Sequence, residues 1–213
     1  MTPDGLSFGL IGGALELRAN GDGAKRLRGS FPYRKRAVIS DGGRGRRPEK
    51  EEFEENAFEF RVKDPDAEIH LLSGHRFDKP LASKIAGTLT LKDTAPALLF
   101  DALITRDVAE TSHARDVLAL LAAGLATGIS PGFRMPPERA VAKEDAEEFI
   151  DEPLRPEDGM FGARIRRIKQ ALLFELSIVT APAYPDAQVE VRNRKPPPSA
   201  FLRPSLAFSR WRP

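Results

Sequence analysis

Cysteine is absent from this chain of 213 residues, and histidine occurs only three times. The absence of cysteine excludes disulfides, thiolate metal sites and cysteine nucleophiles, and it suits a reducing cytoplasm. Covalent catalysis would therefore need serine, threonine or lysine. A general base that works near neutral pH would have to be His70, His75 or His113.

Long apolar runs and a strong net charge are also missing. The mildly apolar stretch from residue 6 to 17 follows Asp4, has no Lys or Arg before it and contains Glu16, so we do not expect a signal peptide. No run approaches the roughly 20 apolar residues that span a bilayer. The 33 basic residues nearly balance the 31 acidic ones, for a net charge of +2. Neither a membrane nor a nucleic acid is therefore expected as a partner.

The residues that are present predict one domain of the α+β class, dominated by strands. Apolar residues make up 41% of the chain, which is enough for one core. Alternating apolar residues and turn residues predict strands at 6–17, 27–39, 58–62, 68–72, 88–91, 98–104 and 165–179. The clearest helix is expected at 113–123, ended by Gly124. We expect surface loops at 40–51 and 136–158, the second of them weakly ordered.

Ser130 follows the predicted helix, in the sequence Gly-Ile-Ser-Pro-Gly-Phe. If this segment is extended, Ser130 points away from the face shared by Ile129, Pro131 and Phe133. Flanking glycines allow a close backbone approach, which suits a nucleophile, although the segment is not a Gly-x-Ser-x-Gly elbow. On pattern alone, a serine in a Gly/Pro turn is the favoured interpretation of Ser130.

His75 and Glu175 are the other two residues to which a chemical role can be given. His75 follows Gly74 at the predicted end of a strand, where a side chain can reach a cleft, or it is simply a surface histidine. Glu175 lies between apolar residues of a strand and needs a partner there. That partner would be a histidine that Glu175 orients, or one of three arginines in a salt bridge. The arginines are Arg164, Arg166 and Arg167.

Metal and nucleotide sites are not indicated by the remaining motifs. Asp66, Glu68, His70 and His75 are close in sequence, but two histidines five residues apart lie on opposite faces of a strand. The glycine-rich segments at 9–13 and 42–45 lack the lysine and the strand and helix context of a nucleotide-binding loop. We therefore expect no metal and no cofactor.

Five blocks of the chain, in order, resemble the prohead maturation proteases of tailed phages, distant relatives of herpesvirus assemblin. The blocks are RLRGSFPY, FEENAF, HLLSGHRFDKPLA, SHARDVLALLAAGLATGISPGF and RRIKQALLFELSIVTAPAYPDA. The resemblance implies an antiparallel β-barrel-like core with surrounding helices. It also implies a serine endopeptidase in which Ser130 is the nucleophile, His75 the base and Glu175 the third member.

A second serine, Ser177, and the proline after Ser130 bear on this assignment. Ser177 is the rival nucleophile, but it lies two residues from Glu175 in a packed strand, so we expect it to support the site. The family usually has a small or aliphatic residue after the serine, whereas this chain has Pro131. Because proline has no amide hydrogen, residue 131 cannot donate to an oxyanion.

The resemblance further implies partners and a location. The substrates would be the scaffold or delta segment of the major capsid protein and the protease itself, cut by a homo-oligomer inside the prohead, in the host or bacterial cytoplasm. We expect an N-terminal segment at 1–26, the protease domain at 27–191 and a basic, proline-rich, disordered tail at 192–213. The alternatives are a catalytically inactive capsid assembly or scaffold-binding protein and, less favoured, a nucleic-acid packaging role for the tail.

Overall fold

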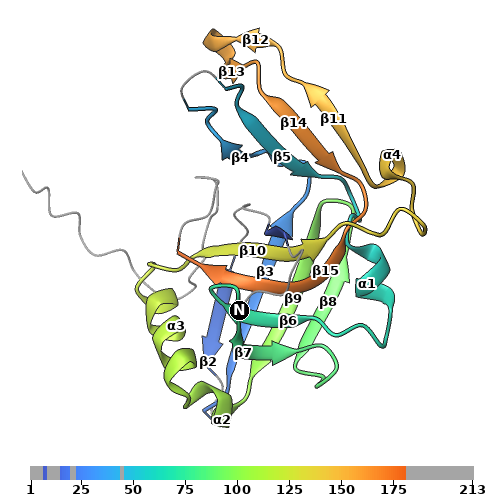
Figure 1. The fold of residues 1–213 in the computed structure, drawn as a ribbon. Helices are drawn as coiled ribbons and strands as arrows, with labels where there is room; N and C mark the ends of the chain where they lie inside the picture. Colours follow the sequence, from blue (N-terminus) through green and yellow to red (C-terminus); the bar gives the residue numbers. More distant parts are fainter. Residues whose placement is uncertain (1–6, 9–14, 20–22, 44–45, 181–213) are drawn as a thin grey trace, which may run out of the picture.

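The computed structural model describes residues 7–8, 15–19, 23–43 and 46–180, and it is rich in strands with few helices (Figure 1). The predicted tail at 192–213 lies outside the described residues. A five-stranded sheet carries the order β1-β10-β15-β6-β7. Its strands are β1 (Ser7–Phe8), β10 (Gly128–Arg134), β15 (Leu172–Val179), β6 (His70–Ser73) and β7 (Arg76–Ser83).

A four-stranded sheet packs behind the first, and its strands run across those of the five-stranded sheet (Figure 1). It consists of β2 (Leu15–Ala19), β3 (Lys25–Pro32), β9 (Ala97–Ile104) and β8 (Leu89–Asp93), in that order, and all its pairs are antiparallel. The predicted strands at 88–91 and 98–104 are thereby confirmed, with slightly different ends.

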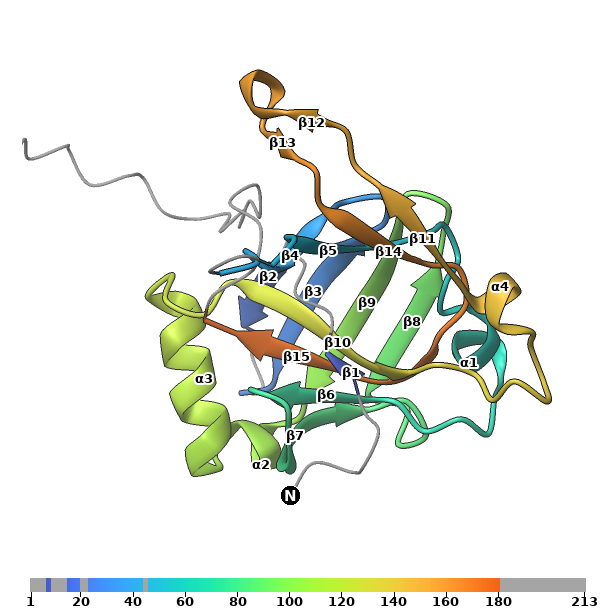
Figure 2. The same ribbon diagram turned by 45° about the horizontal axis from the view of Figure 1, so that its top comes forward.

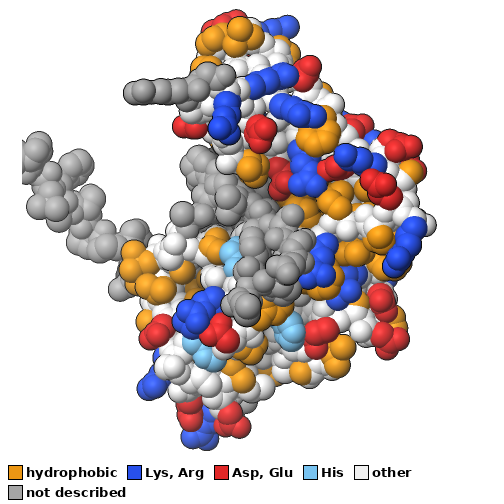
Figure 3. All heavy atoms as spheres, viewed as in Figure 1, with side chains coloured by type: hydrophobic (Ala, Val, Ile, Leu, Met, Phe, Trp, Pro, Cys, Tyr) orange, Lys and Arg blue, Asp and Glu red, His pale blue; other side chains and the backbone are white. Residues whose placement is uncertain are grey.

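A second four-stranded sheet projects from one end of these two layers (Figure 2). We call it the charged sheet; it consists of β11 (Glu147–Asp151), β14 (Arg164–Ile168), β5 (Glu49–Phe53) and β4 (Ala37–Ser40). A short ribbon of β12 (Leu154–Arg155) and β13 (Met160–Phe161), joined by a 3₁₀ turn at Pro156–Asp158, extends it. Basic and acidic side chains alternate over its surface (Figure 3).

In the part of the chain that the structure describes, four α-helices lie at the edges of the sheets. They are α1 (Glu59–Lys63), α2 (Arg106–Ala109), α3 (Ser112–Ala122) and α4 (Lys143–Ala146). The helix predicted at 113–123 is confirmed as α3, which buries Ala114, Val117 and Leu121 and is followed by Gly124 with a positive φ. None of the helices in the described part of the chain is long and apolar enough to cross a membrane.

An aromatic cluster joins the three sheets in the core. Phe31 of β3, Phe53 of β5 and Phe133 of β10 are fully buried, and the Phe53 ring lies 5.4 Å from that of Phe31 and 5.1 Å from that of Phe133, centroid to centroid. Both contacts are edge-to-face, a favourable arrangement for aromatic rings. Since each ring comes from a different sheet, the cluster fixes how the charged sheet meets the other two.

The α+β class is confirmed, but the barrel-like, antiparallel core is corrected in two ways. The strands of the described residues form separate sheets and no closed barrel. Two pairs, β15 with β6 and β14 with β5, are parallel. Pairing of β14 with β5 joins segments about 115 positions apart, which sequence patterns along the chain do not reveal.

Three local predictions were wrong. Residues 58–62 were expected as a strand, but Phe58 and Val62 pack on the core from α1 and its cap, four residues apart, while Phe60 is exposed. Residues 147–151, expected in a loop, form β11, which pairs with β14. The predicted loop at 40–51 already contains the start of β5 at Glu49. In each case, contacts with distant strands override the local pattern.

Candidate active site

Ser130, Ser177 and Glu175 share one face of the two central strands of the five-stranded sheet. β10 and β15 are antiparallel, with Ser130 opposite Ser177 and Gly132 opposite Glu175. Residues directly opposite each other in a sheet project to the same side, about 4.5–5.5 Å apart at Cβ. Ser130 thus lies on an extended segment, which was the condition for it to project away from Ile129, and Ile129 is buried.

His75 reaches this face from the turn between β6 and β7. Ser73 pairs with Arg76, so the turn has only two residues, Gly74 and His75, with φ values of 62° and 60°. Two left-handed residues in succession make the tight turn that matches the twist of a hairpin. For a residue other than glycine this conformation costs roughly 1–2 kcal/mol. Contacts of the turn with the rest of the protein must therefore offset this strain.

Two hydrogen bonds to β15 hold the turn. The amide of Gly74 donates to the carbonyl oxygen of Ile178 at 3.1 Å, and the amide of His75 donates to Ser177 Oγ at 2.8 Å. Each such bond contributes about 1 kcal/mol net. Together they position the imidazole before any substrate arrives.

The imidazole of His75 contacts Glu175 directly. His75 Nδ1 lies 2.7 Å from Glu175 Oε1. Because an ionised carboxylate only accepts hydrogen bonds, Nδ1 is the nitrogen that carries the hydrogen, and Nε2 is the nitrogen with the lone pair. This tautomer is the one that a general base needs when a carboxylate orients it.

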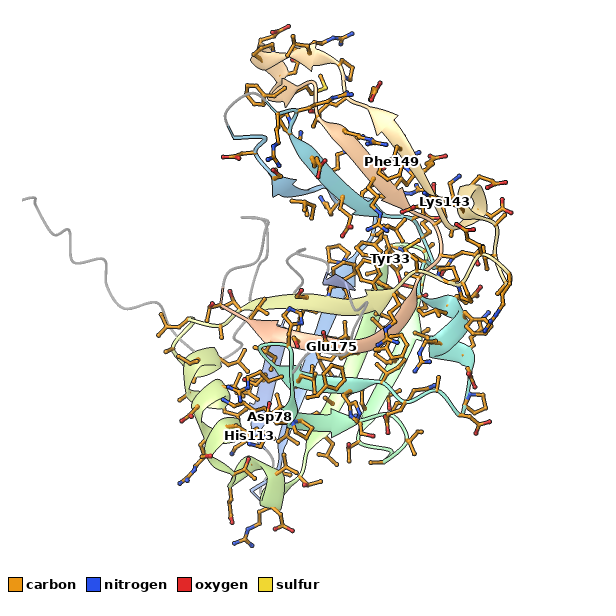
Figure 4. The ribbon with its side chains drawn as sticks, in the orientation of Figure 1. Tyr33, Asp78, His113, Lys143, Phe149 and Glu175 are labelled. Carbon is orange, nitrogen blue, oxygen red and sulfur yellow. The ribbon has the colours of Figure 1, made fainter. Side chains whose placement is uncertain are left out.

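Glu175 is fully buried, and both of its oxygens have partners. Oε1 contacts His75, and Oε2 accepts a hydrogen bond of 2.6 Å from Ser177 Oγ. Figure 4 shows Glu175 on β15, between β10 and the β6–β7 hairpin. Burying a carboxylate is costly unless such partners replace water. The site thus contains a chain of hydrogen bonds from the His75 amide through Ser177 and Glu175 to the His75 ring.

The salt-bridge alternative for Glu175 is wrong. Arg166 pairs with Glu147, Arg167 pairs with Glu52 and Glu148, and Arg164 lies over the ring of Phe149. All three arginines belong to β14 in the charged sheet, whereas Glu175 belongs to β15. The segment at 165–179 was expected to be one strand, but it changes sheets at Lys169–Ala171.

Gly132 makes room for the carboxylate of Glu175, a role that sequence reasoning missed. A Cβ atom built on Gly132 would lie 2.1 Å from Glu175 Oε1 and 2.7 Å from its Cδ, far inside contact distance. The glycines beside Ser130 were expected to allow a close backbone approach at the nucleophile. The structure shows that this glycine is instead required by the third residue of the site.

Ser130 is fully buried, and its register partner on β15 is Ser177. Ser177 lies opposite Ser130 on the neighbouring strand and is hydrogen-bonded to both His75 and Glu175. The structure therefore gathers Ser130, His75, Glu175 and Ser177 from β10, β15 and the β6–β7 turn, positions that span about 100 residues of sequence.

An irregularity in β10 and β15 lies beside these residues. The register shifts after Gly132, so that Phe133 is opposite Leu173 and Phe174 is the extra residue. The guanidinium carbons of Arg61 and Arg134 lie 4.1 and 5.0 Å from the centre of the Phe174 ring. Bulges of this kind often re-aim side chains next to active sites. Nothing in the sequence pattern marks this one.

The other two histidines are placed differently: His70 is the register partner of Glu175 on the neighbouring strand β6, and His113 belongs to α3. The His70 ring lies edge-to-face against Phe77. His113 is at the start of α3, and its Nε2 lies 3.0 Å from the carbonyl oxygen of Pro80. Within residues 23–43 and 46–180, no group of three or more His, Asp or Glu side chains is arranged to hold a metal ion.

Comparison with known proteins adds one finding. The family model described as caudovirus prohead serine protease matches residues 43–198, a range that includes His75, Ser130 and Glu175. No curated protein and no solved structure gives a significant match. The matched range covers well over half of the chain, and its description agrees with the resemblance seen in the five sequence blocks. The chain therefore belongs to the caudovirus prohead serine protease family, whose members act on capsid proteins inside the prohead of an infecting phage.

Proposed function

We propose that this protein is a serine endopeptidase that cleaves the scaffold or delta segment of the major capsid protein during prohead maturation. The observation that carries the proposal is the 2.7 Å contact between His75 Nδ1 and the buried carboxylate of Glu175, on the sheet face that also bears Ser130. A buried, hydrogen-bonded carboxylate on a histidine beside a serine is the arrangement of a catalytic triad.

In the proposed mechanism, Ser130 Oγ attacks the scissile carbonyl carbon while His75 Nε2 takes the hydroxyl proton. Glu175 stabilises the imidazolium that forms. The same proton then passes from Nε2 to the leaving amine as the C–N bond breaks, which leaves an acyl-enzyme on Ser130. A water molecule, deprotonated by His75, attacks the ester and releases the acid product and the free serine.

Ser177 and Gly132 serve this mechanism by positioning Glu175. The Ser177 hydroxyl donates to Oε2 and so restrains the carboxylate that restrains the imidazole. Gly132 leaves the space in which that carboxylate lies. The oxyanion requires a donor other than residue 131, since Pro131 has no amide hydrogen.

Family membership and the chain's composition support the finer parts of the proposal. We infer that the substrates include the protease itself, that the active species is a homo-oligomer inside the prohead, and that residues 27–191 form the protease domain with a removable tail at 192–213. The distant relation to herpesvirus assemblin stays a prediction from the sequence blocks.

The decisive experiment co-expresses the protein with a major capsid protein from the same genome and follows trimming by mass spectrometry. Ser130→Ala should abolish trimming by at least about 1,000-fold while the variant keeps its thermal unfolding temperature. Ser177→Ala is the matched control, since it removes the rival hydroxyl from the same face and should leave measurable trimming. Unchanged trimming by Ser130→Ala would refute the assignment of the nucleophile.

One observation favours a second candidate, a catalytically inactive capsid assembly protein: the Ser130 side chain has no exposed surface. His75→Ala separates the two candidates. A protein that only binds capsid protein should support assembly of normal shells with this substitution, whereas a protease should yield untrimmed capsid protein.

A further inference from the structure

The two edges of β10 are occupied very differently. One edge pairs with β15 along the whole strand, from Gly128 to Arg134. Among the described residues, the other edge pairs only with β1, a strand of two residues near the start of the chain, with Ser7 opposite Phe133 and Phe8 opposite Gly132 (Figure 2). β1 is also the outermost strand of its sheet.

The edge that β1 occupies passes directly beside Ser130. Gly132, the partner of Phe8, is two residues from Ser130, which is about 6.6–6.8 Å along an extended strand. A free strand edge presents unpaired amide and carbonyl groups that can bind an extended peptide through main-chain hydrogen bonds. A peptide bound antiparallel along this edge would bring its backbone past the serine hydroxyl.

Burial of the site shows that the described conformation is closed to such a peptide. Ser130, Gly132 and the other residues from Gly128 to Phe133 are all buried, and so is Glu175. A nucleophile must come into contact with the carbonyl carbon that it attacks. A protein substrate therefore reaches Ser130 only after this face of β10 has been uncovered.

We propose that β1, the segment Ser7–Phe8, occupies the peptide-docking edge of β10 and competes with the substrate for it. This inference rests on the proposed function, because it takes Ser130 as the residue that substrates must reach. Only one strand can pair with the edge at a time. Since the segment is part of the same chain, its effective concentration at the edge is in the millimolar range, so dilute peptides compete poorly.

The fold shows where the competing segment can be removed. β2 begins at Leu15 and pairs with β3 over five residues, so the sheet behind the site keeps its outer strand when the preceding residues are deleted. Removal of residues 2–14 takes away β1 and no other described element.

The first experiment measures strand binding without catalysis. A fluorescein-labelled peptide with the sequence of residues 1–14 is titrated into the Ser130→Ala protein, with and without residues 2–14, and binding is followed by anisotropy. The shortened protein should bind the peptide at least about 10-fold more tightly than the full chain. Equal affinities, or no binding by the shortened protein, would overturn the proposal.

Two variants of the full chain keep the test decisive if the shortened protein folds poorly. Ser7→Pro with Phe8→Pro, also in the Ser130→Ala background, disrupts the pairing, because one of two adjacent amides in an antiparallel strand faces its neighbour and proline has none. It should bind the peptide as the shortened protein does. Ser7→Ala with Phe8→Ala keeps both amides and should bind the peptide with the same affinity as the full-length Ser130→Ala protein. An increase in affinity equal to that of the proline variant would contradict strand pairing as the cause.

The second experiment uses the intact serine and a fluorophosphonate probe. Ser130 should be labelled at least about 10-fold faster in the protein that lacks residues 2–14, and added peptide should slow this labelling. No labelling of any variant would refute Ser130 as an activated nucleophile, whereas the peptide titration tests the occupied edge by itself. The two proposals can therefore fail separately.

Discussion

The charged sheet and the five-stranded sheet both bury glutamates, but they neutralise them differently. In the charged sheet, Glu52 of β5 contacts Arg36 and Arg167, and Lys50 of β5 contacts Glu152, the residue that follows β11. In the five-stranded sheet, Glu175 contacts a histidine and a serine hydroxyl. The first arrangement uses partners with a permanent charge, and the second uses an imidazole and a hydroxyl group.

This difference separates a structural role from a chemical one. Arg and Lys hold their protons at all physiological pH values, so their pairs with glutamate can stabilise a fold but cannot relay a proton. Histidine changes its charge between about pH 5 and 8, and a buried carboxylate beside it selects its tautomer. The type of partner, more than the burial of the glutamate, therefore indicates which sheet carries the chemistry.

The largest effect is expected from a substitution that breaks the pair of His75 and Glu175 in the five-stranded sheet. Glu175→Gln keeps the size of the side chain but removes the charge that stabilises the imidazolium and allows the other tautomer of His75. We expect kcat/KM for a capsid-protein peptide to fall by about 10³–10⁴ while the fold is kept. The matched control is Glu52→Gln in the charged sheet, which should leave kcat/KM unchanged. Equal losses in both variants would contradict the distinction between the two sheets.

A smaller loss of activity is expected from Gly132→Ala. The new methyl group would overlap Glu175 Oε1, so the carboxylate must shift away from His75. We expect kcat to fall by about 10- to 100-fold with little change in KM, because a misplaced catalytic group affects the chemical step. Steady-state kinetics and the pH profile of kcat test this. A variant with wild-type kcat would show that the carboxylate does not need its present position.

Loss of an arginine from the charged sheet should affect stability alone. Arg167→Met removes the hydrogen bonds to Glu52 and Glu148 and leaves the nearly buried Glu52 with Arg36. We expect a loss of about 1–3 kcal/mol in unfolding free energy, measured with urea, and an unchanged kcat/KM at 25 °C. A large drop in kcat/KM without unfolding would instead indicate that the charged sheet acts on the site.

The smallest expected effect concerns the pH dependence of the charged sheet. Burial raises the pKa of Glu51 to about 7, against the opposing effect of Arg166 and with a further increase from Glu147. A raised pKa means that the folded protein keeps a proton that the unfolded chain has lost. The resulting stability is full below about pH 4.5 and is lost as the pH rises through about 7.

Glu51→Gln should therefore have a higher unfolding temperature relative to wild type at pH 8 than at pH 5, by a few degrees. Glu148→Gln is the control with the opposite sign, since hydrogen bonds from Lys169 and Arg167 lower the pKa of Glu148. Its stabilising effect is present above its usual pKa, so this variant should lose stability at pH 8. A rise in unfolding temperature at pH 8 for both variants would point to net charge as the cause.

Local patterns predicted the elements that carry the site better than they predicted the sheet around it. Helix α3 follows from a short-range apolar stripe and is present. Alternation placed Ser130 opposite to Ile129 only if their segment was extended, and this condition is met in β10. The exchange of sheets at 169–171 was missed because only two polar residues, Lys169 and Gln170, separate the apolar residues on either side. The parallel pairing of β5 with β14 depends on contacts between distant residues, which no local period encodes.

The candidate site shows the same limit at the level of single residues. His75 was expected at the end of a strand, but it occupies a left-handed position in a tight turn, where asparagine or glycine is the usual signal. The function of Gly132 could not be foreseen, because it depends on a side chain from another strand. The chemistry of the residues pointed to the site, and the packing of the strands determined how they meet.

The two-residue turn that carries His75 also limits how this protein can vary among its relatives. A turn of two left-handed residues cannot accommodate a change in length. An insertion or a deletion between Ser73 and Arg76 would therefore turn the His75 side chain away from the sheet face. Position 74 can accept only glycine or a residue such as asparagine that tolerates this conformation. In an alignment of relatives, we therefore expect the spacing of this hairpin to be invariant even where the surrounding sequence has diverged.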